Sequence, residues 1–149
     1  MQKLLIFLFL IPFTAAGQTT KTEDIFKGEN CLVTCMGTFD NDSLVSAYVT
    51  FDAKDDRLPK LTNYFTICYD TPRNVFKFLS ELEKFSGDNS LTSTEIGKHK
   101  VEIDKSTGTK MVKVFDERGM IFHRFTPKLI TTIKTNLNGW GLQNKIILE

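Results

Sequence analysis

The sequence predicts an α+β domain in which about six strands form one mostly antiparallel sheet, or two small sheets, with two amphipathic helices packed on one side. Six short segments alternate between apolar and polar residues and are separated by turns rich in Asp, Asn, Ser and Gly. Two longer segments each begin with Thr-Pro and carry apolar residues at helical spacing. The segments follow one another in the order βββα–βββα.

The chain has 149 residues, and its first 17 are typical of a secretory signal peptide. Lys3 supplies the positive start, residues 4–13 form an apolar run, and residues 14–17 are small. We expect cleavage near Ala16 or Gly17. The apolar run is shorter than the roughly 20 residues that a membrane span needs, although a retained N-terminal anchor is the alternative. The predicted location is therefore secreted or periplasmic, with no stable membrane anchor once the leader is removed.

The charge balance argues against two classes of partner. The chain has 19 basic and 18 acidic residues, and removing Lys3 with the leader leaves 18 of each. A neutral domain lacks the positive surface that nucleic-acid binding requires. It also lacks a polybasic segment that would hold it on an anionic membrane. We therefore expect no nucleic-acid partner.

The N-terminal half of the mature chain predicts a flexible arm followed by three strands. Residues 18–30 are polar and mixed in charge, which favours the arm, and residues 31–149 are expected to form a single domain. Strands are predicted at residues 31–38, 44–52 and 61–69. An Asp- and Asn-rich turn joins the first two strands as a hairpin. In the third strand, simple alternation places Phe65, Ile67 and Tyr69 on the same side.

The first helix is the best-defined prediction. Thr71 is a good N-cap, because its hydroxyl can accept hydrogen bonds from the free N–H groups of the first turn. Pro72 occupies the first helical position, where its missing N–H costs nothing. Gly87 is placed to end a helix over residues 72–86. The apolar face consists of Val75, Phe78, Leu79, Leu82 and Phe85.

The C-terminal half repeats this plan. Strands are predicted at residues 94–104, 109–115 and 120–125, and a second helix at residues 127–138, ended by Gly139. A short strand is expected in the tail at residues 145–148.

The two helix entries resemble each other at an offset of 55 residues. Residues 71–85 align with residues 126–140, sharing Thr-Pro, a basic residue and most of the apolar positions. This pattern suggests an internal duplication. Because Thr-Pro is a favourable helix start in itself, convergence of two unrelated helices explains the pattern equally well.

Three cysteines leave the disulfide question open. Cys31 and Cys35 would share a face of one strand about 13 Å apart, which is too far to bridge. Cys68 could form a disulfide with Cys31 or Cys35 if their strands pair, and export would permit it. The alternative is that all three are small buried hydrophobic residues.

No motif indicates a catalytic, metal or cofactor site. His99 and His123 are the only histidines, and their spacing does not match a metal-ligand pattern. Cys68 lies just before a helix N-terminus and is the best-placed thiol for Cys–His catalysis, but no local signature accompanies it. We therefore assign no catalytic residue, no metal and no cofactor from the sequence.

The strongest binding candidates are Tyr48 and Tyr64. Both fall on strand faces opposite the better apolar row, and tyrosine is enriched at interface hot spots. The sequence therefore favours a small exported, non-catalytic module that binds a protein partner. A small exported hydrolase and a carrier of a small hydrophobic ligand are the alternatives, and the oligomeric state is left open.

Overall fold

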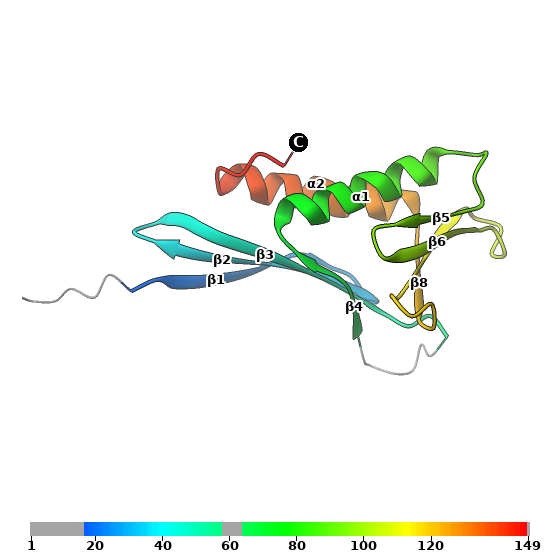
Figure 1. Cartoon of the computed structure of the whole chain (residues 1–149), viewed down its shortest axis with the longest axis horizontal. Coiled ribbons are helices and arrows are strands. Elements are labelled where there is room, and N and C mark those ends of the chain that lie inside the picture. Colours follow the sequence, from blue (N-terminus) through cyan, green and yellow to red (C-terminus); the bar gives the residue numbers. More distant parts are fainter. Residues whose placement is uncertain (1–16, 58–63, 149) are drawn as a thin grey trace, which may run out of the picture.

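The computed structural model describes residues 17–57 and 64–148 (Figure 1). Residues 1–16 of the expected leader, and residues 61–63 of the expected third strand, lie outside this range. None of the helices within it is long and apolar enough to cross a membrane. The elements are β1 (Thr19–Lys27), β2 (Cys31–Asp40), β3 (Ser43–Lys54), β4 (Tyr64–Asp70), α1 (Pro72–Gly87), β5 (Ser93–Ile96), β6 (His99–Asp104), β7 (Met111–Phe115), β8 (Phe122–Phe125) and α2 (Pro127–Gln143).

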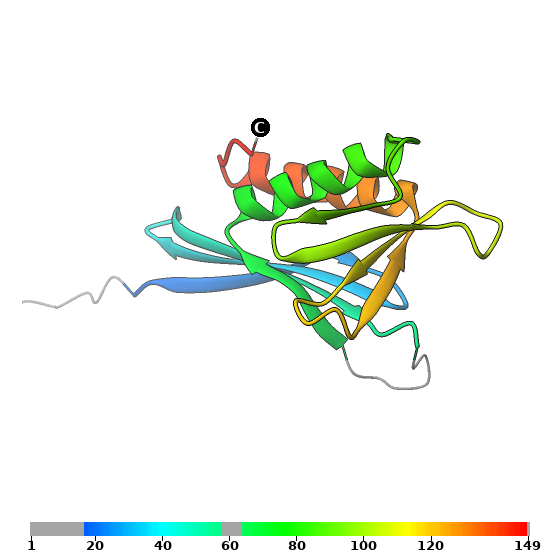
Figure 2. The same ribbon diagram turned by 45° about the vertical axis from the view of Figure 1, so that its right-hand side comes forward.

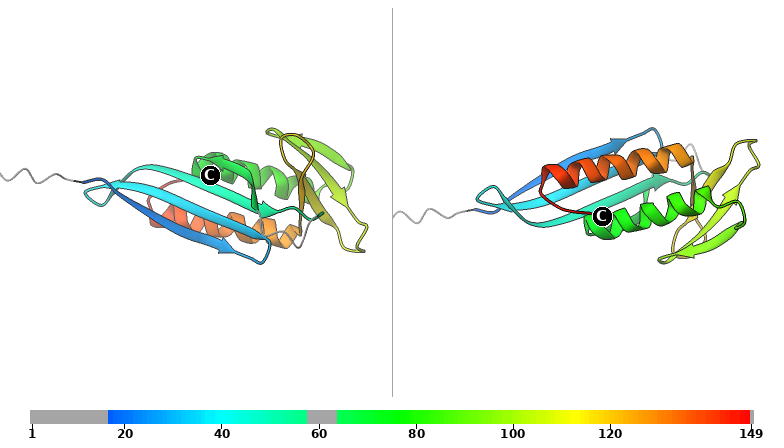
Figure 3. Two further views of the ribbon diagram at one scale, coloured as in Figure 1. Left: turned by 90° about the horizontal axis from the view of Figure 1, so that it is seen from below. Right: turned by 90° about the horizontal axis from the view of Figure 1, so that it is seen from above.

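The strands form two antiparallel sheets, which confirms the α+β class. Sheet A has the order β1-β2-β3-β4 and sheet B the order β5-β6-β7-β8. The two helices lie side by side and antiparallel on one face of sheet A (Figures 1 and 3). Sheet B stands at one end of sheet A, below the far end of α1 (Figure 2). The observed order is therefore ββββα twice, with one more strand in each half than the sequence predicted.

The additional strand in the first half is β1, in the segment expected to be a flexible arm. It pairs with β2 from Thr19 opposite Phe39 to Lys27 opposite Leu32. Most of the β1 side chains are exposed, so a polar sequence is tolerated there. Only Ile25 and Phe26 pack against the core. Its alternation was therefore too weak to indicate a strand.

The additional strand in the second half arises because the expected strand 94–104 is a hairpin. Gly97 adopts a φ of +60°, and Ile96 pairs with His99 across the two-residue turn. Glycine takes this left-handed conformation without the steric penalty of a side chain. β5 and β6 are the two arms of that hairpin.

Both helices begin where the sequence predicted. The Thr71 hydroxyl accepts a hydrogen bond from the Asn74 backbone N–H, and the Thr126 hydroxyl accepts one from that of Leu129. The predicted apolar face of α1 is buried, together with Phe76. This face packs against sheet A and α2. The same core continues into sheet B, because the ring of Phe51 in sheet A contacts that of Phe125 in sheet B, with centroids 5.4 Å apart.

The end of α2 differs from the prediction, because the helix continues through Gly139 to Gln143. Trp140 extends the buried stripe of the helix by one more turn, and this burial outweighs the poor helix propensity of glycine. The tail then folds back instead of forming the expected strand at 145–148. The Ile146 backbone N–H donates to the Gly141 carbonyl over 2.8 Å, and Leu148 is buried.

A bulge in β4 changes which residues face the helices. Phe51 pairs with Cys68 and Asp52 with Thr66, so that Ile67 is an extra residue in the ladder. A bulge shifts the alternation of a strand by one residue. Tyr69, expected on the same side as Ile67, therefore pairs with Thr50 on the opposite face.

Candidate functional site

The face of sheet A that points away from the helices is the first candidate surface, and we call it the open face. Along β3, Val49, Phe51 and Ala53 are buried under the helices, so the residues between them point the other way. Seen from below, no other described segment covers this face (Figure 3). The register assigns to it a set of mainly hydroxyl-bearing and aromatic residues from all four strands: Thr20, Thr22, Asp24, Lys27, Leu32, Thr34, Met36, Thr38, Ser46, Tyr48, Thr50, Asp52, Lys54, Tyr64, Thr66 and Tyr69.

Three tyrosines stand out on the open face. Tyr48, Tyr64 and Tyr69 are 44%, 42% and 58% exposed. Tyr48 stacks on Tyr69 with ring centroids 5.5 Å apart and an interplanar angle of 11°. Met36 lies directly across from Tyr48 in the neighbouring strand. The stack gives the face an exposed aromatic patch on strands β3 and β4.

Tyr64 shares the face but not the stack. It pairs with Lys54, six residues along β3 from Tyr48, which corresponds to about 20 Å of strand. Its hydroxyl donates to the Glu29 carbonyl over 3.4 Å, and the Lys54 ammonium lies 5.5 Å from the centroid of its ring. The two tyrosines predicted as a site are thus on one surface, but it is Tyr69 that joins Tyr48.

Two carboxylates on the open face, Asp24 and Asp52, accept hydrogen bonds from neighbouring threonines. The Thr34 hydroxyl donates to Asp24 over 2.8 Å, and the Thr66 hydroxyl donates to Asp52 over 2.7 Å. Each bond crosses from one strand to the next. The surface is therefore amphipathic, with hydroxyl and aromatic groups outnumbering its few charges.

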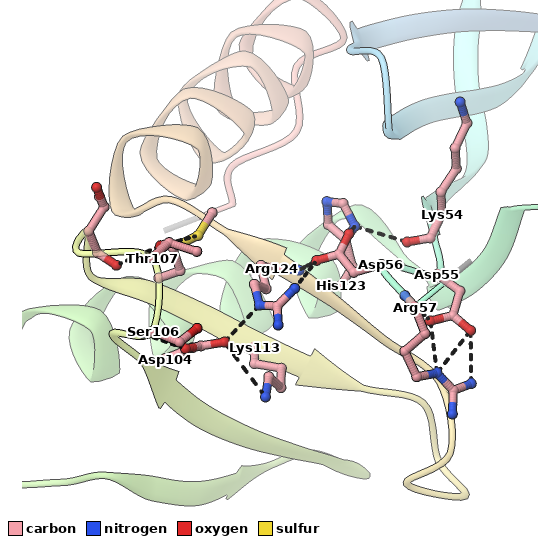
Figure 4. Close-up of polar contacts among 12 residues, drawn as sticks. Lys54, Asp55, Asp56, Arg57, Asp104, Ser106, Thr107, Lys113, His123 and Arg124 are labelled. Atoms are coloured by element: carbon pink, nitrogen blue, oxygen red, sulfur yellow. Dashed lines mark hydrogen bonds and ion pairs between the residues drawn. The ribbon is translucent and has the colours of Figure 1, made fainter. Parts of the chain in front are cut away.

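A second polar centre lies where the two sheets meet (Figure 4). Asp56, just beyond β3, accepts a hydrogen bond from the backbone N–H of Arg124 over 2.9 Å, and its other carboxylate oxygen lies 2.8 Å from the Nδ1 of His123. The Asp56 backbone N–H in turn donates to the Phe122 carbonyl over 3.0 Å. The His123 Nδ1 also lies 2.9 Å from the Lys54 carbonyl. This single carboxylate therefore fastens the end of β3 to β8.

Charged groups continue from this centre across the outer side of sheet B. Arg124 donates from Nε to Asp104 over 2.7 Å, and the Lys113 ammonium lies 3.7 Å from the same carboxylate (Figure 4). Hydrogen bonds from Ser106 and Arg124 hold the pKa of Asp104 well below its ordinary value. Arg124 is thus already engaged by the acids around it.

The structure does not support the disulfide proposed for Cys68. All three cysteines are free. β3 lies between β2, which carries Cys31 and Cys35, and β4, which carries Cys68. Two strand spacings amount to about 9.6 Å, beyond the Cα separation of about 7 Å that a disulfide tolerates. Burial is the largest cause that raises the thiol pKa to about 12 for Cys31 and Cys35 and to about 11 for Cys68.

The residues considered for catalysis are dispersed. His99 lies on β6, with its Nδ1 2.8 Å from the Phe115 carbonyl and its ring against Phe78. His123 lies on β8 beside Asp56, and Cys68 lies on β4 in sheet A. No group of three or more His, Cys, Asp or Glu side chains in residues 17–57 and 64–148 could hold a metal ion.

No protein-family model, curated protein or solved structure matches this chain. The open face and the Asp56 centre are therefore the observations from which its function is argued.

Sequence reasoning missed two members of these sites. Tyr69 was assigned to the wrong strand face, because the bulge in β4 cannot be recognised from the sequence. Asp56 belongs to a charged segment that was predicted to be a loop. Asp56 and its partners His123 and Arg124 are 67 and 68 residues apart in the chain, and no local pattern connects them. The only signal in the sequence was a run of charged residues after a strongly alternating strand. Such runs are too common in proteins to indicate a functional site.

Proposed function

We propose that this protein is a small exported, non-catalytic module that binds a protein partner on the open face of sheet A. The observation that carries the proposal is the exposed stack of Tyr48 on Tyr69, on strands β3 and β4 of a sheet face that the helices leave free. Tyrosine supplies a large contact area with few rotatable bonds, so it contributes strongly to binding energy at protein interfaces.

The composition of the face defines the kind of partner. Threonine and serine hydroxyls surround the tyrosines, and the two aspartates are already hydrogen-bonded to threonines. Such a surface fits a flat, amphipathic protein surface with little net charge. Because few charges on the face are free to pair with a partner, binding should depend only weakly on salt concentration.

The two alternatives have less support. A hydrolase built on Cys68 and a histidine would need a nucleophile beside its base, whereas these groups lie on different sheets and the Cys68 thiol has a raised pKa. A carrier of a hydrophobic ligand would need an apolar cavity between helices and sheet. A depression of about 540 Å³ between the two halves of the chain has both polar and apolar walls and opens to solvent.

The proposal is tested by site-specific cross-linking in the cells that export the protein. A photo-reactive phenylalanine replaces Tyr69 in one variant and Lys100 in the control, because Lys100 is exposed on sheet B, away from the open face. We expect a discrete adduct with one other protein from position 69 and none from position 100. The partner is then purified and its affinity measured directly.

The affinity measurement decides the outcome. Tyr69→Ala should weaken binding of the purified partner by at least tenfold, as expected for truncation of a hot-spot tyrosine. Lys100→Ala should leave it unchanged. An adduct that contains only a second copy of this chain, equal adducts at both positions, or an affinity unaffected by Tyr69→Ala would each refute the proposed partner surface.

A further inference from the structure

A groove of about 540 Å³ lies beside the Asp56 centre, away from the open face. Its walls come from the β1–β2 turn, the end of β3, the β6–β7 turn, β8 and the start of α2. The groove thus lies where the two ββββα halves meet. Phe26, Met111 and Leu129 contribute apolar walls, while Glu29, Asp56 and His123 contribute polar ones.

His123 presents one ring nitrogen to this groove. The residue is 5% exposed, and its Nδ1 lies 2.8 Å from an Asp56 oxygen and 2.9 Å from the Lys54 carbonyl. Both neighbours are hydrogen-bond acceptors, so Nδ1 carries a proton. In the neutral ring, Nε2 is therefore the unprotonated nitrogen and can accept a hydrogen bond.

The described residues provide no partner for Nε2. Every fully buried side-chain nitrogen or oxygen in residues 17–57 and 64–148 has a partner, so Nε2 is not sealed in the core. Figure 4 shows it on the side of the ring away from the Lys54 carbonyl, facing the space between α2 and the β1–β2 turn. This is the space that the groove occupies. A carboxylate that fixes one nitrogen of a histidine and leaves the other available is a common arrangement in ligand-binding sites.

The surroundings select the chemistry of a ligand. A metal ion would need further ligands, and the described residues offer no group of three. An anion would need a free cation, but the guanidinium of Arg124 is held by Asp104 and Asp56. Glu29 instead adds a negative charge to the groove, while the charge of Asp56 is paired with that of Arg124. The site therefore favours a hydrogen-bond donor attached to an apolar body.

We propose that this groove binds a small amphipathic ligand whose hydroxyl or amine group donates a hydrogen bond to the Nε2 of His123, while its apolar part packs against Phe26, Met111 and Leu129. Asp56 is a positioning residue in this site, because together with the Lys54 carbonyl it provides acceptors at Nδ1 that orient the ring and leave Nε2 available. The proposal is independent of the partner surface on sheet A.

Two probe molecules test the site with the wild-type protein. Phenol carries a hydroxyl donor on an apolar ring, and anisole has the same ring with the donor replaced by a methoxy group. The ring nitrogens of His123 are followed by NMR during titration with each probe. We expect saturable shifts of the His123 signals with phenol and affinity for anisole lower by about tenfold, since anisole cannot make the hydrogen bond.

The same spectra test the protonation of the ring. The proposal requires the neutral form of His123 with the proton on Nδ1, and a proton on Nε2 would overturn it. Equal affinities for the two probes, shifts confined to another part of the protein, or no binding of phenol would overturn it as well. His123→Asn is the variant of choice, because its amide can still donate toward Asp56 and Lys54 but lacks Nε2. It should reduce phenol affinity to the level of anisole.

Discussion

The three cysteine thiols carry a prediction at the scale of single residues. Burial raises their pKa values to about 12, 12 and 11, so almost none of each thiol is ionised at pH 7 in the folded protein. We expect iodoacetamide to label the native protein much more slowly than the denatured protein. Without reductant, unfolding should release three reactive thiols per chain, as counted by mass spectrometry. A count of one would show that a disulfide exists.

Asp104 carries a prediction on acid stability. Its pKa is lowered from the ordinary value of 3.8 by hydrogen bonds from Ser106 and Arg124. The unfolded chain therefore binds this proton more readily than the folded protein does. The stabilisation is present above pH 3.8 and is lost as the pH falls below it.

Urea denaturation at pH 5 and pH 2.5 measures this loss. The wild-type protein should lose stability between the two values, and Asp104→Asn should lose less because it has no carboxylate to protonate. Glu117→Gln, in an exposed ion pair with Lys98, is the control and should behave like the wild type. An equal loss in the wild type and in Asp104→Asn would contradict the assignment.

The tyrosines show how far single-residue prediction reaches. Tyr48 and Tyr64 were placed on the exposed face from alternation alone, and the structure confirms this placement. Tyr69 was placed on the wrong face, because alternation holds only while the ladder is regular. The bulge beside Phe51 depends on pairing with another strand, so its position is not encoded within β4 itself.

At the scale of elements, the two glycines inside α2 form a natural test pair. A Cβ at Gly139 would meet nothing within 4 Å, whereas a Cβ at Gly141 would lie 2.9 Å from Leu148 and 3.1 Å from the Ile146 carbonyl. Gly139→Ala should therefore stabilise the protein by about 0.5–1 kcal/mol, through better helix propensity. Gly141→Ala gains the same propensity but must displace the tail that packs on the helix.

The free energies of unfolding of the two variants separate these effects. We expect Gly141→Ala to be less stable than Gly139→Ala by at least about 1 kcal/mol, a typical cost of overpacking. Thermal or urea denaturation of both variants provides the comparison. Equal stabilities would mean that the tail does not rest on Gly141.

Elements with strong local signals were predicted well. Both helix starts follow from Thr-Pro, and their caps form as expected. The end of α2 was predicted too early because Gly139 looked like a stop, while burial of Trp140 continued the helix. β1 could not be recognised, because it is stabilised mainly by pairing with β2 and not by an apolar pattern of its own.

At the scale of the whole molecule, the sequence pattern does not predict how the two sheets are placed relative to each other. The order ββββα occurs twice, and each helix starts with the same Thr-Pro cap. This agrees with the duplication suggested by the sequence, which stays a hypothesis. The halves are not independent, since the helices pack on each other and the end of β3 is joined to β8.

At the junction between the end of β3 and β8, two adjacent aspartates have different roles. Asp56 accepts a hydrogen bond from the Arg124 backbone and lies 2.8 Å from the Nδ1 of His123, and both groups are in the other half of the chain. Asp55 is held mainly by Arg57, two residues away, in a local ion pair, and makes a weaker hydrogen bond to the backbone of Phe122. Asp56→Ala should cost about 1–3 kcal/mol of unfolding free energy, because it leaves partly buried donors without their acceptor. Asp55→Ala should cost about 1 kcal/mol or less.

Two measurements on each variant, urea denaturation and amide hydrogen exchange, distinguish a junction between the sheets from an ordinary surface contact. If Asp56 fastens the sheets, the backbone amides of β8 should exchange faster in Asp56→Ala than in Asp55→Ala. The exchange rates of amides in the centre of β2 should change in both variants only by the amount that the change in global stability predicts. Equal costs for the two substitutions would place the connection between the halves in the apolar core around Phe51 and Phe125 alone. The polar groups at the groove would then contribute little to holding the two sheets together.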